Sequence, residues 1–318
     1  MSDGAHLLIP FAFATAEGCT QALRTLALPQ LEKLLARLAP LHTDAGDEFG
    51  LSMPHERVLA RECGLPCEDG RIPWAAWQVV QAGREAGGHA WARITPCHWT
   101  VATNHIDMNH PQDLHLDAGQ SRSLLAAMRP FFEQDGIALE YESPTLWLAQ
   151  GELFRGLATA SLDRVIGRAV DDWMPRAPEA RALRRLQQEM QMLLYTNEVN
   201  DERVRGGALP VNSFWTSGTG ALAAEHAAEV PWGLEVTPHL RDAALLGDWR
   251  GWAAAWQQLD AKECAGLVKA ADAGQPVTLT LCGERNARTW SSQPAGALRR
   301  RLGGLFGGKQ AASVLESL

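Results

Sequence analysis

The hydrophobic and polar positions of the chain follow two spacings that alternate along the sequence. Between Pro29 and Pro40, leucines recur at the i, i+3, i+4 and i+7 positions, and the run Pro178–Leu194 has a similar apolar stripe, so both segments are predicted to be amphipathic helices. Leu7–Ile9 is a short apolar run, and Val277–Leu281 alternates Val or Leu with Thr, which predicts strands. Strands that alternate with helices indicate the α/β class.

The remaining periodic segments extend this prediction. Helices are expected over Ala75–Gln81, Gly119–Gln134 and Trp249–Leu259, and strands over 97–103, Leu209–Trp215, Leu234–Val236 and a hairpin of Leu139–Tyr141 with Thr145–Ala149. After Pro294 the composition changes, because arginines and glycine pairs become frequent. The sequence therefore predicts a single α/β domain over residues 1–294, with a mostly parallel central sheet flanked by helices, and a basic, glycine-containing tail over residues 295–318.

Composition narrows the class of protein without naming a reaction. The chain has 318 residues, of which 46% are hydrophobic and 21% are charged, so it is long and apolar enough to bury a sizeable core. Its formal net charge of −8 counts against a protein that coats nucleic acid, and nucleic acid is not an expected partner.

The termini and the cysteines indicate a cytoplasmic protein. The N-terminal apolar run Leu7–Ala14 is short, contains Pro10 and follows no cationic segment, so it does not resemble a signal peptide. We find no stretch of about 18–20 apolar residues, the length that spans a bilayer. The six cysteines contain no CxxC pair, and we expect them to be reduced and mostly packed.

Tryptophan is over-represented, with 12 Trp against 2 Tyr. Indole side chains in this number are anchors either in the core or at a surface for a ligand or protein partner. In the second case, a Trp-rich surface and the basic tail from Arg299 to Lys309 would together recruit a partner.

A run of histidines follows the strand expected at 97–103. His98 lies on its polar face, and His105, Asp107 and His110 follow in the next loop. A strand that leads into such a loop is a common place for a ligand in α/β folds, and His98 and His105 are candidates for substrate contact. His105, Asp107 and His110 are weaker candidates for a metal site, since their spacing matches no established zinc motif. Hydrogen-bonded surface histidines are the alternative.

A glycine-containing loop is expected after the strand Leu209–Trp215. Ser217, Gly218, Thr219 and Gly220 precede a helix expected over Ala221–Ala228. The N-terminus of a helix presents unpaired amides to an anion, and glycines let a phosphate approach the backbone. A tight strand-to-helix turn is the alternative, because neither a Walker A motif nor GxGxxG is present.

Polar residues just upstream suit the same anion. Asn200 offers an amide, and Arg203 and Arg205 offer guanidinium groups that bind phosphate or carboxylate. Asn212 lies between these residues and the loop. We expect all of them to share one anion site; a capped helix end with solvated charges is the alternative.

These segments also resemble known families. Leu157–Gly167, Leu186–Asn200 and Leu209–Gly220, with His98 upstream and Leu281–Arg285 downstream, resemble the RpfE-type bacterial regulatory proteins, which are often labelled phosphoglycerate mutase-like. More distantly, the pattern from Asn200 to Gly220 is similar to a segment of the archaeal-type cofactor-independent phosphoglycerate mutases.

The second resemblance implies an alkaline phosphatase-like fold, here in a reduced form, and places Asn200, Arg203, Asn212, Gly218 and Gly220 on the substrate side. Those enzymes use two divalent metals and a transiently phosphorylated Ser or Thr. Where they carry an N-terminal Asp-Gly pair and a late Asp-His-x-Thr-Pro motif, this chain has 12–16 (Ala-Phe-Ala-Thr-Ala) and 281–285 (Leu-Cys-Gly-Glu-Arg). We therefore expect no cofactor, with Mn²⁺ or Mg²⁺ as the alternative.

The sequence thus predicts a phosphoglycerate mutase-like protein with a regulatory role that binds a small phosphorylated or carboxylate metabolite. One alternative is a non-catalytic scaffold that acts through its tryptophans and basic tail. The other is an active metal-dependent phosphoglycerate mutase or phosphoesterase.

Overall fold

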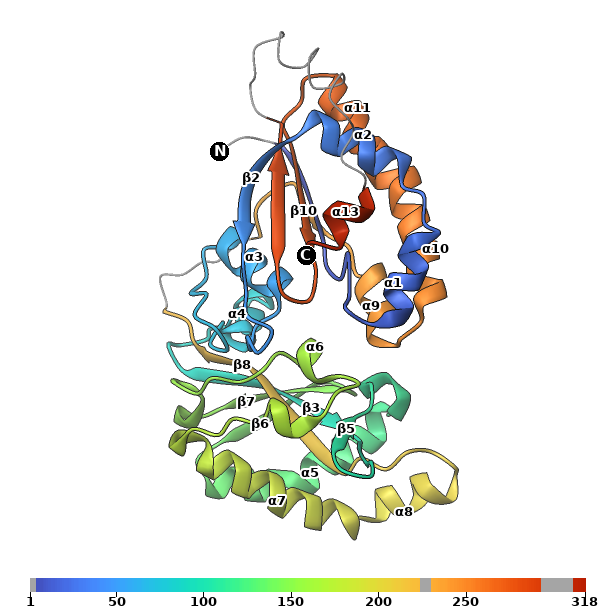
Figure 1. Ribbon diagram of the computed structural model, residues 1–318. Coiled ribbons are helices and arrows are strands. Elements are labelled where there is room, and N and C mark those ends of the chain that lie inside the picture. The colour runs from blue at the N-terminus through green and yellow to red at the C-terminus, as the bar shows by residue number, and fades with distance from the viewer. Residues whose placement is uncertain (1–3, 224–229, 293–310) are drawn as a thin grey trace. The chain divides into compact units, whose positions relative to one another are not determined.

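The computed structural model describes residues 4–223, 230–292 and 311–318. The chain divides into two compact units: unit 1 comprises residues 1–49, 53–59 and 230–318, and unit 2 comprises residues 50–52 and 60–229. Each unit has its own main β-sheet with helices beside it, which confirms the α/β class (Figure 1). Most of the expected basic tail lies outside the described residues.

Unit 1 contains a five-stranded sheet in the order β2-β11-β10-β1-β9. Its strands are β1 (Ala5–Ile9), β2 (Ala39–Asp44), β9 (Leu234–Val236), β10 (Val277–Cys282) and β11 (Ala287–Ser291). Its helices are α1 (Glu17–Arg24), α2 (Pro29–Arg37), α9 (His239–Leu245), α10 (Trp249–Leu259), α11 (Ala265–Asp272) and α13 (Ala311–Leu315), and α3 (Pro54–Glu62) begins in it. β1 runs parallel to β9 and β10, whereas β11 is antiparallel to both β10 and β2.

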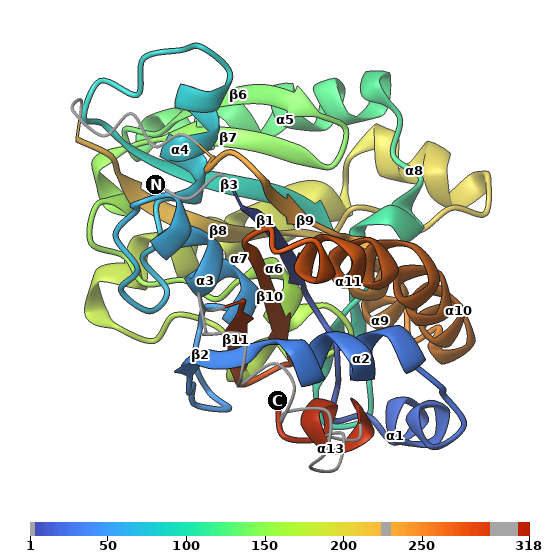
Figure 2. The same cartoon turned by 90° about the horizontal axis from the view of Figure 1, so that it is seen from above.

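The period-two pattern of β1 divides its side chains between two apolar clusters. Leu7 and Ile9 pack in the larger cluster with residues of α2, α10 and α11, and Leu8 packs with Val58 of α3 in a smaller one. Helices α2 and α11 both contribute residues to the larger cluster and contact each other there (Figure 1 and Figure 2). The leucine stripe predicted for α2 is confirmed, since Leu31, Leu34 and Leu35 are buried.

The start of α2 is held by a residue far away in the sequence. Leu28 precedes the helix and provides no capping side chain. Asp260 lies in a π-helical segment (Asp260–Cys264) between α10 and α11, and its carboxylate accepts the N–H groups of Leu31 at 2.7 Å and Gln30 at 3.2 Å. A carboxylate is favourable there because it satisfies unpaired amides and faces the positive end of the helix dipole.

The carboxyl end of β1 is closed by indole groups. The chain leaves β1 through Phe11, whose φ of 52° is unusual for a residue with a side chain. Trp252 Nε1 donates to the Phe11 carbonyl at 2.9 Å, and Trp256 Nε1 donates to the Ala12 carbonyl at 3.1 Å. Both tryptophans are fully buried. The predicted Trp-rich helix is therefore confirmed as α10, and its indoles fill the core of unit 1.

Unit 2 contains a four-stranded antiparallel sheet in the order β6-β7-β3-β8. Its strands are β3 (Ala90–Cys97), β6 (Ala138–Ser143), β7 (Leu146–Gln150) and β8 (Ser213–Ala221), and β4 (Trp99–Val101) and β5 (Ile106–Met108) form a separate hairpin. Its helices are α4 (Trp74–Gln81), α5 (Ala118–Gln134), α6 (Leu162–Val165), α7 (Arg181–Tyr195) and α8 (Glu198–Arg205). One core cluster joins α5 and α7 to this sheet, and α4 contacts β3 and β8.

Parallel pairing was expected to dominate, and among the described strands it joins only β1 to its two neighbours. For the two hairpins β6–β7 and β10–β11, the physical reason is the length of the connection. β6 and β7 are joined by the turn at Pro144, and β10 and β11 by 283–286, and such short turns can join only antiparallel strands. The predicted hairpin β6–β7 is confirmed, whereas β3 was missed as a separate strand before Cys97.

The largest difference from the sequence prediction concerns Ser217–Gly220. These residues lie inside β8, which extends to Ala221, so no helix begins there; residues 224–229 lie outside the described part of the chain. Gly218 and Gly220 have φ values of +63° and +141°. A Cβ on either would lie 3.0 Å from the Cβ of Trp74 or Pro73, so the glycines allow α4 to pack closely on β8.

The tryptophans do not form a surface. Nine of the 12 are buried, Trp77 and Trp249 are half-buried, and Trp232 is 83% exposed. Several indoles donate to internal acceptors, as Trp215 does to the Ala160 carbonyl at 3.0 Å, which explains why they lie in the core. All six cysteines are free thiols, and only Cys67 is exposed. None of the helices within the described residues is long and apolar enough to cross a membrane.

Candidate functional site

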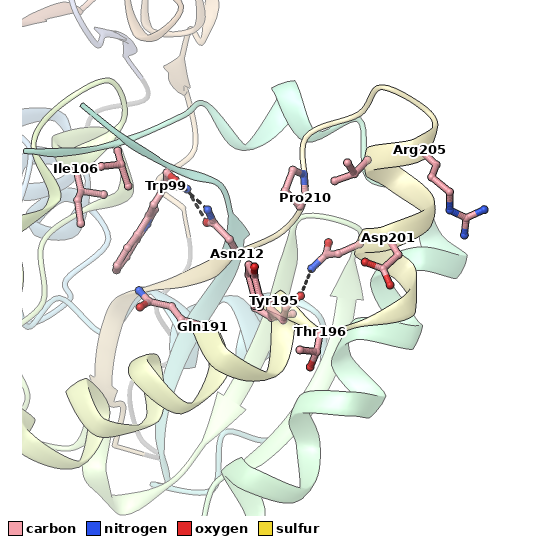
Figure 3. Close-up of a pocket in the computed structure, with 13 residues that line it drawn as sticks. Trp99, Ile106, Gln191, Tyr195, Thr196, Asp201, Arg205, Pro210 and Asn212 are labelled. Atoms are coloured by element: carbon pink, nitrogen blue, oxygen red, sulfur yellow. Dashed lines mark hydrogen bonds between the residues drawn. The ribbon is translucent and has the colours of Figure 1, made fainter. Parts of the chain in front are cut away.

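A cavity of about 1060 Å³ lies in unit 2, at the C-terminal end of α7 (Figure 3). The hairpin β4–β5, helix α8 and the segment before β8 complete its walls. Its lining is mostly apolar, and six of the 13 lining residues are polar or charged. The lining residues are Trp99, Val101, Ile106, Gln191, Leu194, Tyr195, Thr196, Asn200, Asp201, Val204, Arg205, Pro210 and Asn212.

Helix α7 is fixed in place by its apolar stripe. Leu186, Met190 and Leu194 are buried in the core of unit 2, as the sequence predicts, and Gln187 donates to the Phe214 carbonyl of β8 at 3.2 Å. The last turn of the helix therefore presents its other side to the cavity. Tyr195 lies there and is 85% exposed.

Helix α8 follows after a short connection, and its two ends have clear local signals. Asn197 caps the first turn, because its side chain accepts the Val199 N–H at 3.0 Å. After the last turn, Gly207 has a φ of +78°, and the Ala208 N–H donates to the Arg203 carbonyl at 2.9 Å. This is a Schellman ending, in which glycine is favoured because the residue is left-handed. The chain then reverses towards β8.

Asn200 holds this reversal together. Its amide nitrogen donates to the carbonyls of Leu194 at 2.8 Å and Val211 at 2.7 Å, and its oxygen accepts the Val211 N–H at 2.8 Å. The side chain is buried, although the residue borders the cavity. The amide predicted to contact a ligand thus bonds to the backbone at the base of the site.

Arg203 points into unit 2, away from the cavity. Its guanidinium donates to the carbonyls of Leu209 and Leu114 and to the side-chain oxygen of Gln120, and the residue is 3% exposed. Burial lowers the pKa of this guanidinium, and the charge of Asp117 opposes that effect. Arg203 joins α8 to the N-terminal part of α5 and the turn before it.

Arg205 occupies the outer side of α8. It is exposed, lines the cavity, and has no hydrogen-bond or ion-pair partner within the described part of the chain. Its guanidinium extends outward, away from Trp99 and Asn212 (Figure 3). Asp201 lies one helical turn earlier on the same wall and is likewise exposed. The cavity therefore has one cationic and one anionic side chain at its α8 end.

Asn212 defines the opposite end. Its side-chain oxygen accepts the Trp99 N–H at 2.7 Å, and its amide nitrogen donates to the Trp99 carbonyl at 2.9 Å (Figure 3). His98, next to Trp99, donates from Nδ1 to the Pro210 carbonyl at 2.8 Å. His98 thus helps to hold the hairpin against the segment before β8, and it does not line the cavity.

The candidates for a metal site bond to protein groups. His105 has Nδ1 2.7 Å from Asn104 Oδ1 and Nε2 3.0 Å from Asp107 Oδ2, on the exposed hairpin turn. His110 Nδ1 accepts the Gln112 N–H at 3.1 Å and caps a 3₁₀ turn. Within residues 4–223, 230–292 and 311–318, no group of three His, Cys, Asp or Glu could hold a metal ion. These side chains do not fit a two-metal centre.

The predicted residues therefore separate into two sets. The cavity brings together Asn200, Arg205 and Asn212, whereas Ser217–Gly220 lie in β8 outside its lining. Thr219 is buried and its hydroxyl donates to the Leu157 carbonyl at 2.6 Å. The glycine-rich run and the arginines do not converge on one site.

Sequence reasoning missed the apolar walls. Val101, Tyr195 and Val204 line the cavity and are 79%, 85% and 57% exposed. One signal was available: Val204 is an apolar residue in the strongly charged segment Glu198–Arg205 and lies one helical turn after Asn200, which also borders the cavity. Large apolar residues that remain exposed around a hollow mark an interaction site.

Comparison with known proteins gives little beyond these observations. No family model and no curated protein sequence matches the chain. A cofactor-independent phosphoglycerate mutase from Thermoplasma acidophilum is 12% identical over 99% of both chains, with a TM-score of 0.35. The PH0037 protein from Pyrococcus horikoshii is 11% identical over 96% of this chain and 94% of its own, with a TM-score of 0.45. Identity and superposition this low carry no activity, ligand or cofactor over to this chain.

Proposed function

We propose that this protein binds a small organic ligand with an apolar body and a carboxylate or phosphate group, and that this binding has a regulatory role. The observation that carries the proposal is the cavity, whose volume of about 1060 Å³ and mostly apolar walls are typical of sites for small molecules. The apolar body lies against Trp99, Tyr195 and Val204.

Arg205 supplies the anion contact. Its guanidinium is planar, exposed and without a partner in the described part of the chain, so it turns on its flexible stem to meet a carboxylate or phosphate in bidentate geometry. Asp201 disfavours a second anionic group on the same wall. The ligand therefore carries its negative charge at one end only.

We propose that the cavity binds its ligand without catalysing a reaction, because of the side chains that line it. The 13 lining residues include no His, Cys, Ser, Lys or Glu, and the Asn200 and Asn212 amides are engaged with the backbone. Asp201 is the single carboxylate among them. The hydroxyls of Tyr195 and Thr196 are the other reactive groups of the lining, and within the described residues no hydrogen bond joins either of them to Asp201, so the lining holds no nucleophile paired with a base.

Calorimetric titration tests the proposal. We expect phenylacetate, octanoate and phenyl phosphate to bind, and 3-phosphoglycerate and inorganic phosphate, which lack an apolar body, to bind at least about ten-fold more weakly. Arg205→Gln lowers affinity for the anions by about ten-fold, the value of a lost charge-assisted hydrogen bond. Val204→Ser lowers it by weakening the apolar wall.

Arg250→Gln is the matched control, since Arg250 is an exposed arginine of unit 1. Its affinity equals that of the wild type. Absence of binding by every apolar anion contradicts the proposal, and so does full affinity in both cavity variants. Interconversion of 2- and 3-phosphoglycerate in the presence of Mn²⁺ would contradict binding without turnover and support the mutase alternative.

A further inference from the structure

The hairpin β4–β5 leaves one edge of β4 open beside the cavity. Its antiparallel register pairs Trp99 with Met108 and Val101 with Ile106. The His98 carbonyl accepts the N–H of Asn109, and the Ala102 N–H donates across the hairpin. Because hydrogen-bonded and non-hydrogen-bonded pairs alternate in such a ladder, residues 98, 100 and 102 bond to β5, and Trp99 and Val101 direct their N–H and C=O groups to the other side.

The first position on that outer edge is already filled. The carboxamide of Asn212 accepts the Trp99 N–H and donates to the Trp99 carbonyl, so one side chain pairs with this residue as a neighbouring strand would (Figure 3). Val101 is the next residue with outward-facing backbone groups. It lines the cavity and has no such partner within the described residues.

The wall next to Val101 suits an apolar side chain. Tyr195 and Val204 lie on the helical walls of the same cavity and leave large apolar surfaces in solvent. Trp99 is buried beneath the edge and gives it a rigid base. An unpaired strand position beside an apolar hollow is the arrangement that accepts an added strand, in which the backbone gives affinity and alternate side chains enter the hollow.

We propose that the cavity binds the carboxyl-terminal segment of a partner protein in extended conformation. Its backbone pairs with the N–H and C=O of Val101, an apolar side chain lies against Tyr195 and Val204, and its terminal carboxylate meets Arg205. Charge complementarity favours this occupant, because Arg205 is the single cation in the lining and a chain terminus brings one carboxylate next to a peptide unit. This inference rests on the proposed function and names the class of ligand for the same cavity.

Peptide binding to the full-length protein tests the inference. A library of fluorescein-labelled hexapeptides with apolar residues at alternate positions is measured by fluorescence polarisation, each as free acid and as carboxyl-terminal amide. We expect members with an apolar last residue to bind as free acids, and the amides to bind about ten-fold more weakly because the contact with Arg205 is lost.

The pairing with Val101 is tested by changing the protein and, separately, by changing the peptide. Val101→Pro removes the outward N–H at an edge position that tolerates proline, and lowers peptide affinity by about ten-fold. Val101→Thr keeps the N–H and the β-branched shape, and binds peptide within about two-fold of the wild type. Because Val101→Pro could disturb the hairpin, the wild-type protein is also titrated with the best peptide carrying single N-methyl groups. We expect one such position to abolish binding.

The outcomes separate the two proposals. If phenylacetate and octanoate bind and no peptide does, the inference about the partner is overturned and the proposed function stands. Peptides that bind equally well to Val101→Pro, or with an N-methyl group at every position, overturn the pairing with β4. If neither peptides nor simple anions bind, both proposals fail.

Discussion

The end of β1 in unit 1 and the cavity in unit 2 use similar side chains in opposite ways. At the end of β1, Trp252 and Trp256 are fully buried, and each donates to a main-chain carbonyl. Around the cavity, Tyr195 and Val204 are more than half exposed and contact little protein. Aromatic and apolar residues fill the core in the first region and are exposed to solvent around the cavity in the second. Composition alone therefore does not indicate where a binding surface lies; exposure decides it.

The largest effect on the free energy of unfolding is expected from removing a buried tryptophan at the end of β1. Trp252→Ala removes a fully buried indole and leaves the Phe11 carbonyl without its donor, and we expect a loss of about 3–5 kcal/mol in the free energy of unfolding. Urea denaturation followed by circular dichroism measures it. Trp232→Ala, at a tryptophan that is 83% exposed, is the control and changes stability by about 0.5 kcal/mol or less. Equal losses in the two variants would refute the assignment of Trp252 to the closed core.

Two arginines of α8 show the same contrast between a buried and an exposed side chain within unit 2. Arg203→Met leaves one buried and two part-buried acceptors without their donor, and we expect it to lower the free energy of unfolding by about 2–4 kcal/mol. Arg205→Met changes an exposed, partnerless side chain and lowers it by about 0.5 kcal/mol at most. Urea denaturation of both proteins checks this difference. The assignment of Arg203 to structure and Arg205 to the cavity would be wrong if Arg205→Met were the more destabilising change.

The smallest effect concerns the thiols of the closed region. Burial raises the pKa of Cys19 to about 11 and that of Cys264 to about 12, from an ordinary value of 9.0. Above pH 9 the unfolded chain ionises these thiols while the folded protein keeps them protonated, so the unfolded state binds fewer protons. Their contribution is complete below pH 9, and stability falls as the pH rises from 9 towards 11 and 12.

Denaturation curves at pH 8, 9 and 10 measure this slope. The double variant Cys19→Ala/Cys264→Ala is expected to lose less stability between pH 8 and pH 10 than the wild type. Cys67→Ser, at the exposed thiol, keeps the wild-type slope. An unchanged slope in the double variant would show that these two thiols do not cause the alkaline loss.

The elements that sequence analysis predicted well are those whose signal is local. The apolar stripes of α2 and α7 depend on residues within a few positions of each other. The failure at Gly218 and Gly220 has a non-local cause. Their positive φ values are typical of loops, and the structure uses them where α4 packs on β8. A glycine pair alone does not distinguish these cases.

The site was predicted in part for the same reason. Asn200, Arg205 and Asn212 were placed together because they are close in sequence, and the cavity borders all three. Arg203 was grouped with them, although its side chain is buried in unit 2 and does not line the cavity. Val101 reaches the cavity from a hairpin about a hundred residues earlier, and only the register of β4 shows that its backbone faces outward. No single-residue pattern contains that information.

The exposure of Cys67 has a practical consequence. It belongs to unit 2, and the other five thiols are buried, so a thiol-reactive fluorophore will modify the native chain at one position without any engineered cysteine. A dye attached to Cys67 reports on unit 2, and it allows single-molecule fluorescence measurements without any change to the sequence.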